Sequence, residues 1–178
     1  MSSGDERTRT FTWQDPMAVG KAALKMAGAD FLRAIQERKL PPPPIASLMG
    51  FDIEEVGEGR VVFTVDPQEF HYNPIGTVHG GLAATLLDSA MGCAVHSLLP
   101  EGRAYTTLEL KVNYLRAIRH DTGRVRGIGK VIHLGGKIAT AEGQVVDGAG
   151  KLYAHATTTC LLSNVEDGQR GHSSSVSR

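Results

Sequence analysis

The longest run of apolar and small residues extends from His79 to Leu98 and predicts one long helix. Apolar or small side chains occupy nearly its whole circumference, and its single formal charge belongs to Asp88. Helices that are apolar all round are buried rather than laid on a surface. An ionised carboxylate in such a helix is costly unless it is paired, hydrated or used in chemistry. Asp88 is therefore the first candidate functional residue.

Alternating apolar and polar positions predict strands before and after this helix. The expected strands cover residues 51–56, 60–66, 108–114 and about 122–134, 137–147 and 151–162. The clearest alternation places Leu108, Leu110, Val112 and Tyr114 on one face. Two strands, a long apolar helix and four strands predict an α+β fold, in which an antiparallel sheet curls around the central helix.

The segments outside this pattern have simpler interpretations. Residues 1–16 are polar and indicate an irregular arm, and residues 17–39 indicate an amphipathic helix that Gly28 weakens. The four prolines at 41–44 indicate an extended spacer, because they lack the N–H groups of a helix. Residues 163–178 are rich in Ser, Gly and charge, so we expect a disordered tail. The domain proper then covers residues 45–162.

The composition is that of a single globular domain. The chain has 178 residues, 41% of them hydrophobic, and 19 Lys and Arg balance 19 Asp and Glu. A chain with this charge balance has no overall electrostatic field that would favour binding to nucleic acid or to an anionic membrane. Two cysteines and no apolar leader or span indicate a cytoplasmic protein, and the histidines show no metal-ligand spacing.

The Gly80-Gly81 pair lies where the long helix is expected to begin. The first N–H groups of a helix have no intrahelical acceptor, and glycine lets a ligand approach them closely. One helix therefore carries hydrogen-bond donors at its start and an acid eight residues further along.

Several of these residues belong to one longer pattern. It consists of Asn73-Pro74-Ile75-Gly76-Thr77-Val78-His79-Gly80-Gly81, then Leu87-Asp88, then Thr107-Leu108-Glu109-Leu110-Lys111-Val112-Asn113-Tyr114-Leu115. This pattern resembles the hotdog-fold thioesterases of the phenylacetate-pathway (PaaI-like) type, over roughly residues 45–162. The resemblance implies a hotdog fold and hydrolysis of acyl-coenzyme A thioesters by a homodimer or homotetramer, without a metal or redox cofactor.

The resemblance also implies a role for each matched position. Asp88 corresponds to the catalytic carboxylate, as nucleophile or general base, and the backbone N–H of Gly80 corresponds to the group that polarises the carbonyl. Asn73 corresponds to a residue that orients the carbonyl or water, His79 to a supporting position, and Thr107, or Thr106 in another register, to a hydroxyl near the carboxylate. Substrate binding is further expected at Gly81, His71, Arg116 and Arg126, where the two arginines would hold coenzyme A phosphates.

Each of these positions also has a purely structural explanation. The Asp88 side chain could simply reach solvent. Gly80 and Gly81 could simply permit a tight junction between the loop and the helix, and Asn73 is a residue typical of turns. The basic residues between Lys111 and Lys130 alternatively cover solvated strand faces. The helix over 17–39 packs on the sheet, clamps a dimer or covers the acyl pocket. At the level of function, the alternatives are a non-catalytic acyl-thioester binding or sensor protein and, on the same fold, a hydratase.

The distance between Gly80 and Asp88 predicts sites that two chains share. Eight residues of helix span about 12 Å at ~1.5 Å per residue, too far for both groups to engage one carbonyl carbon. If two such helices run antiparallel across a two-fold axis, the start of one approaches the middle of the other. We therefore expect a homo-oligomer, a dimer or a dimer of dimers, in which each site combines Gly80 of one chain with Asp88 of its partner.

Overall fold

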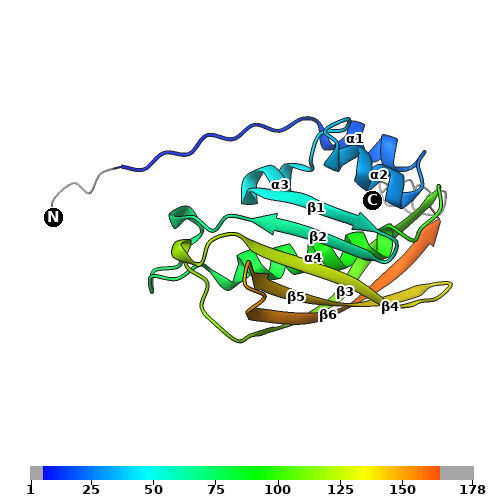
Figure 1. Cartoon of the computed structure of the whole chain (residues 1–178). Coiled ribbons are helices and arrows are strands. Elements are labelled where there is room, and N and C mark those ends of the chain that lie inside the picture. Colours follow the sequence, from blue (N-terminus) through cyan, green and yellow to red (C-terminus); the bar gives the residue numbers. More distant parts are fainter. Residues whose placement is uncertain (1–5, 165–178) are drawn as a thin grey trace, which may run out of the picture.

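The computed structural model describes residues 6–164 and shows six strands and a long central helix (Figure 1). The helices are α1 (Pro16–Ala23), α2 (Gly28–Gln36), α3 (Pro44–Met49) and α4 (Gly80–His96), with short 3-10 turns η1 (Glu69–His71) and η2 (His120–Thr122). The strands are β1 (Phe51–Gly57), β2 (Arg60–Val65), β3 (Arg103–Tyr114), β4 (Val125–Leu134), β5 (Ile138–Asp147) and β6 (Leu152–Asn164). The predicted α+β arrangement is confirmed.

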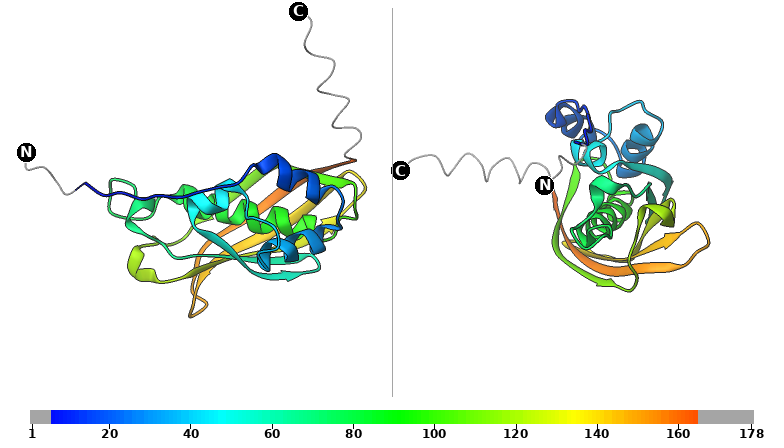
Figure 2. Two further views of the ribbon diagram at one scale, coloured as in Figure 1. Left: turned by 90° about the horizontal axis from the view of Figure 1, so that it is seen from above. Right: turned by 90° about the vertical axis from the view of Figure 1, so that its left-hand side faces the viewer.

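All six strands belong to one antiparallel sheet in the order β1-β2-β4-β5-β6-β3. The sheet curls around α4, which lies in its concave side (Figure 2). The edge strand β1 is contacted by α2 and α3. At the other edge, β3 pairs with β6 on one side and with no strand on its outer side in the described part of the chain.

The long apolar helix is α4, and it is buried as its composition predicts. Leu86, Leu87, Ala90 and Met91 are at most 1% exposed. Glycine in β4 lets the sheet reach the helix backbone, since a Cβ built on Gly129 would lie 2.2 Å from the Ala90 carbonyl oxygen. The helix is therefore held by close packing on the sheet, as expected for a helix without a polar face.

The prediction of one helix over residues 17–39 is wrong, because the structure has two helices there, α1 and α2. The second begins at Gly28, whose N–H donates to the Leu99 carbonyl at 2.9 Å. A Cβ at this position would lie 1.8 Å from the carbonyl oxygen of His96. Gly28 therefore marks a close backbone contact with the end of α4, and this tertiary contact separates the two helices.

Other boundaries differ by a few residues. Pro44 is the first residue of α3 rather than the last of the spacer, because proline suits the first turn of a helix. β6 continues to Asn164, so the predicted tail starts two residues too early, and its remainder lies outside the described residues. No helix within residues 6–164 is long and apolar enough to cross a membrane.

The N-terminal arm contains no helix or strand between residues 6 and 15, as predicted, but it contacts the domain. Arg7 pairs with Glu69 at 2.7 Å. The Arg9 guanidinium lies 4.0 Å from the centre of the Phe70 ring and donates to the Ser47 carbonyl at 3.2 Å. The arm is therefore attached to the loop that precedes α4.

Candidate active site

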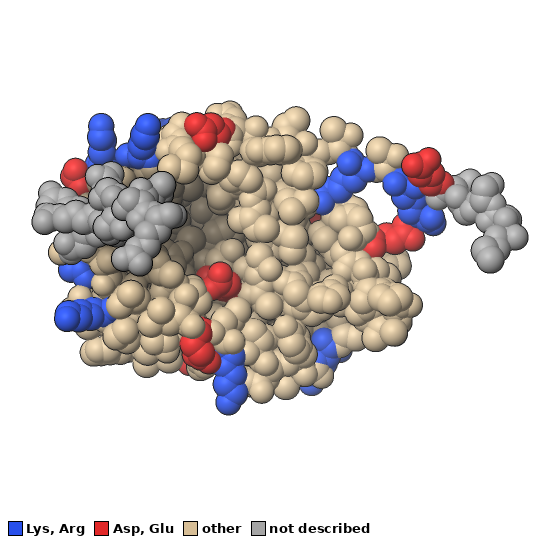
Figure 3. Space-filling model, turned by 180° about the vertical axis from the view of Figure 1, so that it is seen from behind, with Lys and Arg blue, Asp and Glu red and all other residues tan. Residues whose placement is uncertain are grey.

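Asp88 lies on the side of α4 that the sheet leaves partly open. The partly exposed residues on this side of the helix are Gly81, Ala84, Thr85, Asp88 and Ser89, which recur at helical spacing. All except Asp88 are small and uncharged. Seen from behind, the molecule shows a hollow whose surroundings carry few Lys, Arg, Asp or Glu side chains (Figure 3).

The Asp88 carboxylate is positioned by a hydroxyl from the neighbouring strand. The Thr107 Oγ1 in β3 donates to Asp88 Oδ1 at 2.9 Å. This bond fixes one carboxylate oxygen and leaves the other available for water or a carbonyl carbon. The structure therefore brings together Asp88 and Thr107, which are 19 positions apart in the sequence.

A β-bulge decides which threonine reaches Asp88. The β3–β6 register shifts between Thr107 and Glu109, where two residues of β3 face one of β6. Leu110 and Val112 face inward beyond the bulge, whereas Thr107 faces inward before it and Thr106 is exposed. The prediction that Leu108 shares a face with Leu110 and Val112 is wrong, since the bulge turns its side chain outward and leaves it 57% exposed. An unbroken alternation would have turned Thr106 toward the helix.

The thiols near Asp88 are not nucleophiles. Burial raises the pKa of Cys93 to about 12, and the charge of Asp88 adds to this shift. Burial also raises the pKa of Cys160, whose thiol is fully buried. Both thiols are therefore protonated at neutral pH, and thiolate is the reactive form of cysteine. A carboxylate such as that of Asp88 is chemically able to attack a carbonyl or to activate water.

The start of α4 presents a free backbone donor. His79 is the N-cap, and its Nδ1 accepts the Gly81 N–H at 2.9 Å. The Gly80 N–H has no acceptor among the described residues. It borders a cavity of about 330 Å³, whose lining includes His79, Gly80, Tyr114, Arg116, Ile118 and Tyr153. The His79 side chain thus accepts the Gly81 N–H, and the Gly80 N–H stays available to donate to a ligand.

Asn73 and His71 make contacts within the loop that leads to α4. The Asn73 side chain donates to Thr77 Oγ1 at 3.2 Å and accepts the Ile75 N–H at 3.0 Å, which are turn contacts. His71 is buried, and its Nδ1 accepts the Gln68 N–H at 3.0 Å. Burial lowers the pKa of His71, partly opposed by the Met49 backbone. Neither residue lines the cavity at Gly80.

The basic residues after β3 do not form one patch. Arg116 lines the cavity at Gly80 and donates to the Leu152 carbonyl. Arg126 in β4 pairs with Glu54 at 2.6 Å, and Arg124 pairs with Asp66 at 2.7 Å. The ion pairs of Arg126 and Arg124 agree with the alternative interpretation, in which the basic residues lie on solvated strand faces. Within residues 6–164, no group of three or more His, Cys, Asp and Glu side chains is arranged to hold a metal ion.

Three residues near these groups were not predicted. Tyr105 and Cys160 lie close enough to Asp88 for its charge to raise the pKa of both, after the larger effect of burial. Tyr114 lies against Gly80, since a Cβ built there would be 3.2 Å from its ring. Tyr105 lies two residues before Thr107 and faces inward like it. Strand alternation would therefore have predicted the inward position of Tyr105 if the position of the bulge had been known.

The curved sheet around one long helix is a hotdog-type fold, and comparisons with known proteins give the family and the class of activity. Residues 75–154 match the model of the thioesterase superfamily. A Halobacterium salinarum protein, named provisionally as an esterase, is 33% identical over 75% of this chain and 89% of its own length. The 1,4-dihydroxy-2-naphthoyl-CoA hydrolase of Escherichia coli is 31% identical over 65% of this chain and 86% of its own.

Solved structures agree with this assignment. The phenylacetic acid degradation-related protein of Ralstonia eutropha superposes with a TM-score of 0.67 and 27% identity, over 73% of this chain and 98% of that one. The chain belongs to the thioesterase superfamily and is a thioester hydrolase. The hotdog fold implied by the sequence pattern is thereby confirmed.

Replacing Thr107 tests whether its hydroxyl positions Asp88. We expect Thr107→Val to lower kcat by roughly 10- to 100-fold, because a hydrogen bond to a charged group contributes about 1.5–3 kcal/mol. Thr107→Ser keeps the hydroxyl and should retain most of the activity. The measurement is kcat from thiol release, with melting temperatures of both variants. Equal losses in both variants would contradict the positioning role.

Proposed function

We propose that the protein hydrolyses an acyl- or aryl-coenzyme A thioester, with Asp88 as nucleophile or general base. The observation that supports this most directly is the Thr107 hydroxyl on the carboxylate of an otherwise apolar helix. In this mechanism, the Gly80 N–H donates to the carbonyl oxygen and stabilises the negative charge that develops there. Asp88 then attacks the carbonyl carbon, forming an anhydride that water cleaves, or removes a proton from attacking water.

We further propose that each site is formed by two chains. Gly80 and Asp88 lie on the same straight element, eight residues or about 12 Å apart. β3 is a twelve-residue edge strand whose outer side pairs with no other strand of residues 6–164, and such an edge is a template for pairing with a second copy. A two-fold dimer, alone or within a dimer of dimers, brings the start of one α4 toward the middle of the other.

The remaining predicted residues take supporting roles in this proposal. His79 frees the Gly80 N–H by capping Gly81, and Asn73 shapes the turn before it. Arg116 borders the same cavity and suits a phosphate of coenzyme A. His71 is buried with its Nδ1 bonded to Gln68, and Arg126 pairs with Glu54, so their assignment to the substrate rests on the sequence-based expectation alone.

The choice of substrate class and compartment follows from the same observations. The Escherichia coli relative is named for an aryl-coenzyme A substrate, which supports including aryl thioesters. Neither cysteine is paired, as is usual in the reducing cytoplasm, where we place the enzyme. The proposed chemistry uses only protein groups and water, so it requires no cofactor.

Release of free thiol from a panel of acetyl-, hexanoyl- and benzoyl-coenzyme A tests the proposal. We expect turnover with at least one member and stoichiometric formation of the carboxylic acid. A non-catalytic binding or sensor protein would instead bind the thioesters without releasing thiol. A hydratase would consume an enoyl thioester and leave its thioester bond intact.

A further inference from the structure

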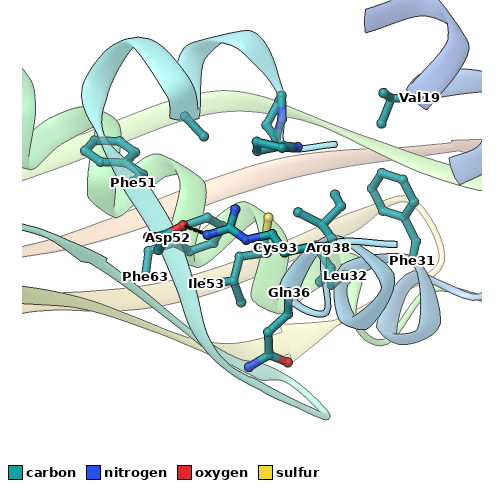
Figure 4. Close-up of a pocket in the computed structure, with 14 residues that line it drawn as sticks. Val19, Phe31, Leu32, Gln36, Arg38, Phe51, Asp52, Ile53, Phe63 and Cys93 are labelled. Carbon is teal, nitrogen blue, oxygen red and sulfur yellow. Dashed lines mark hydrogen bonds and ion pairs between the residues drawn. The ribbon is translucent and has the colours of Figure 1, made fainter. Parts of the chain in front are cut away.

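A second cavity lies between the N-terminal helices and the sheet (Figure 4). Its volume is about 140 Å³, and the apolar side chains that line it include Phe31, Leu32, Ile35, Ala46, Phe63 and Cys93. Cys93 is contributed by α4, and the other lining residues fall between Val19 and Phe63. They therefore precede the segment 75–154 that matches the family model. This chain builds the cavity largely from residues outside that segment.

The cavity and the candidate active site share the helix α4, which contributes Cys93 to the cavity and Asp88 to the site. Cys93 follows Asp88 by five residues, or about 7.5 Å of helix at ~1.5 Å per residue. Ser89 lies one turn before Cys93, is partly exposed and has a small side chain.

We propose that this cavity holds the apolar end of the acyl or aryl group, and that α2 and α3 set its size limit. The inference rests on the proposed thioesterase function, because the thioester carbonyl must lie at Asp88 for the acyl group to extend toward Cys93. An apolar cavity of about 150 Å³ in another protein stays dry and binds benzene. The cavity here is of similar volume, so it suits one aromatic ring or an aliphatic group of equal size.

The polar groups around the cavity favour a ligand end without polar substituents. Gln36 Nε2 donates to the Glu54 carbonyl at 2.8 Å, and Arg38 pairs with Asp52 across the space between α2 and β1 (Figure 4). A hydroxyl on the bound ring would have to compete with these contacts for a partner, which is less favourable than burying the unsubstituted ring. We therefore expect benzoyl to be preferred over hydroxylated benzoyl groups.

Filling the cavity tests the proposal. Ala46 is 5% exposed and lines the cavity, so Ala46→Phe places a ring where the ligand would lie. We expect the ratio of kcat/KM for benzoyl-coenzyme A to that for acetyl-coenzyme A to fall at least about tenfold. The matched control is Ile45→Phe on the same helix, where the side chain is 46% exposed and outside the cavity. Val19→Trp fills the cavity from α1 if Ala46→Phe does not fold.

Enlarging the cavity should shift the preference in the opposite direction. Phe31→Ala removes one wall, and we expect a larger acyl group such as naphthoyl to gain relative to benzoyl. The proposal would be overturned if the benzoyl-to-acetyl ratio of kcat/KM were unchanged in Ala46→Phe, or if it fell equally in Ile45→Phe.

Benzene binding separates this inference from the proposed function. Benzene should raise the melting temperature of the wild type and of Asp88→Asn, but not that of Ala46→Phe. Absence of this effect in the wild type would overturn the cavity proposal even if thioesters are hydrolysed. Absence of thiol release from every thioester would overturn the proposed function, whatever benzene does.

Discussion

Asp88→Asn should lose most thioester hydrolysis and keep its fold. The amide has nearly the shape of the carboxylate, and its oxygen still accepts the Thr107 hydroxyl that now donates at 2.9 Å. It can neither attack the carbonyl carbon nor take a proton from water. We expect kcat to fall by roughly 10²- to 10⁴-fold, the range typical of a lost general base or nucleophile. The measurement is thiol release under saturating substrate, together with the melting temperature.

A matched control removes a carboxylate that has no proposed role. Glu109 follows the bulge of β3 and is exposed, so Glu109→Gln changes the charge by the same amount close to the site. Its kcat should stay within about twofold of the wild type, since surface substitutions away from special features have small effects. Near-wild-type turnover in Asp88→Asn would contradict the central assignment. A fall in melting temperature alongside the lost activity would point to a structural role instead.

The sequence pattern was sufficient to predict the layers of the fold. An apolar helix with one charge requires burial, and alternating strands on both sides of it supply an antiparallel sheet. The positions of Gly80 and Asp88 on one helix followed from spacing alone, and the structure places both on α4. These predictions succeeded because periodicity and length are local properties that the packed protein keeps.

The errors arose where a distant part of the chain changes a local pattern. At Thr107, a bulge inserts one residue against β6 and reverses the alternation, so that Leu108 faces solvent. At Gly28, a backbone contact with the end of α4 divides a continuous amphipathic pattern into two helices. The partners of both contacts, β6 and α4, lie far along the chain, and no local periodicity contains them.

Two inactive variants should restore activity to each other if each site is shared between chains. Gly80→Val crowds the Tyr114 ring, which a Cβ at this position would approach to 3.2 Å, and blocks the free N–H. In a heterodimer of Gly80→Val with Asp88→Asn, one site carries both substitutions and the other carries neither. Because a two-fold dimer has two equivalent sites, we expect about half of the wild-type activity per dimer. Tandem affinity tags isolate the heterodimer, and each inactive homodimer is checked for size and melting temperature.

The reciprocal arrangement gives the opposite result and makes the test decisive. When Gly80→Val and Asp88→Asn are combined in one chain and paired with a wild-type chain, each shared site contains one substitution, so the heterodimer should be inactive. A site contained within one chain predicts the reverse: half activity for this pairing and none for the first. A wild-type chain paired with Asp88→Asn leaves one working site in either arrangement and calibrates half activity. If the first pairing stays inactive while the second is half active, Gly80 and Asp88 act within one chain, and the 12 Å between them must be bridged some other way.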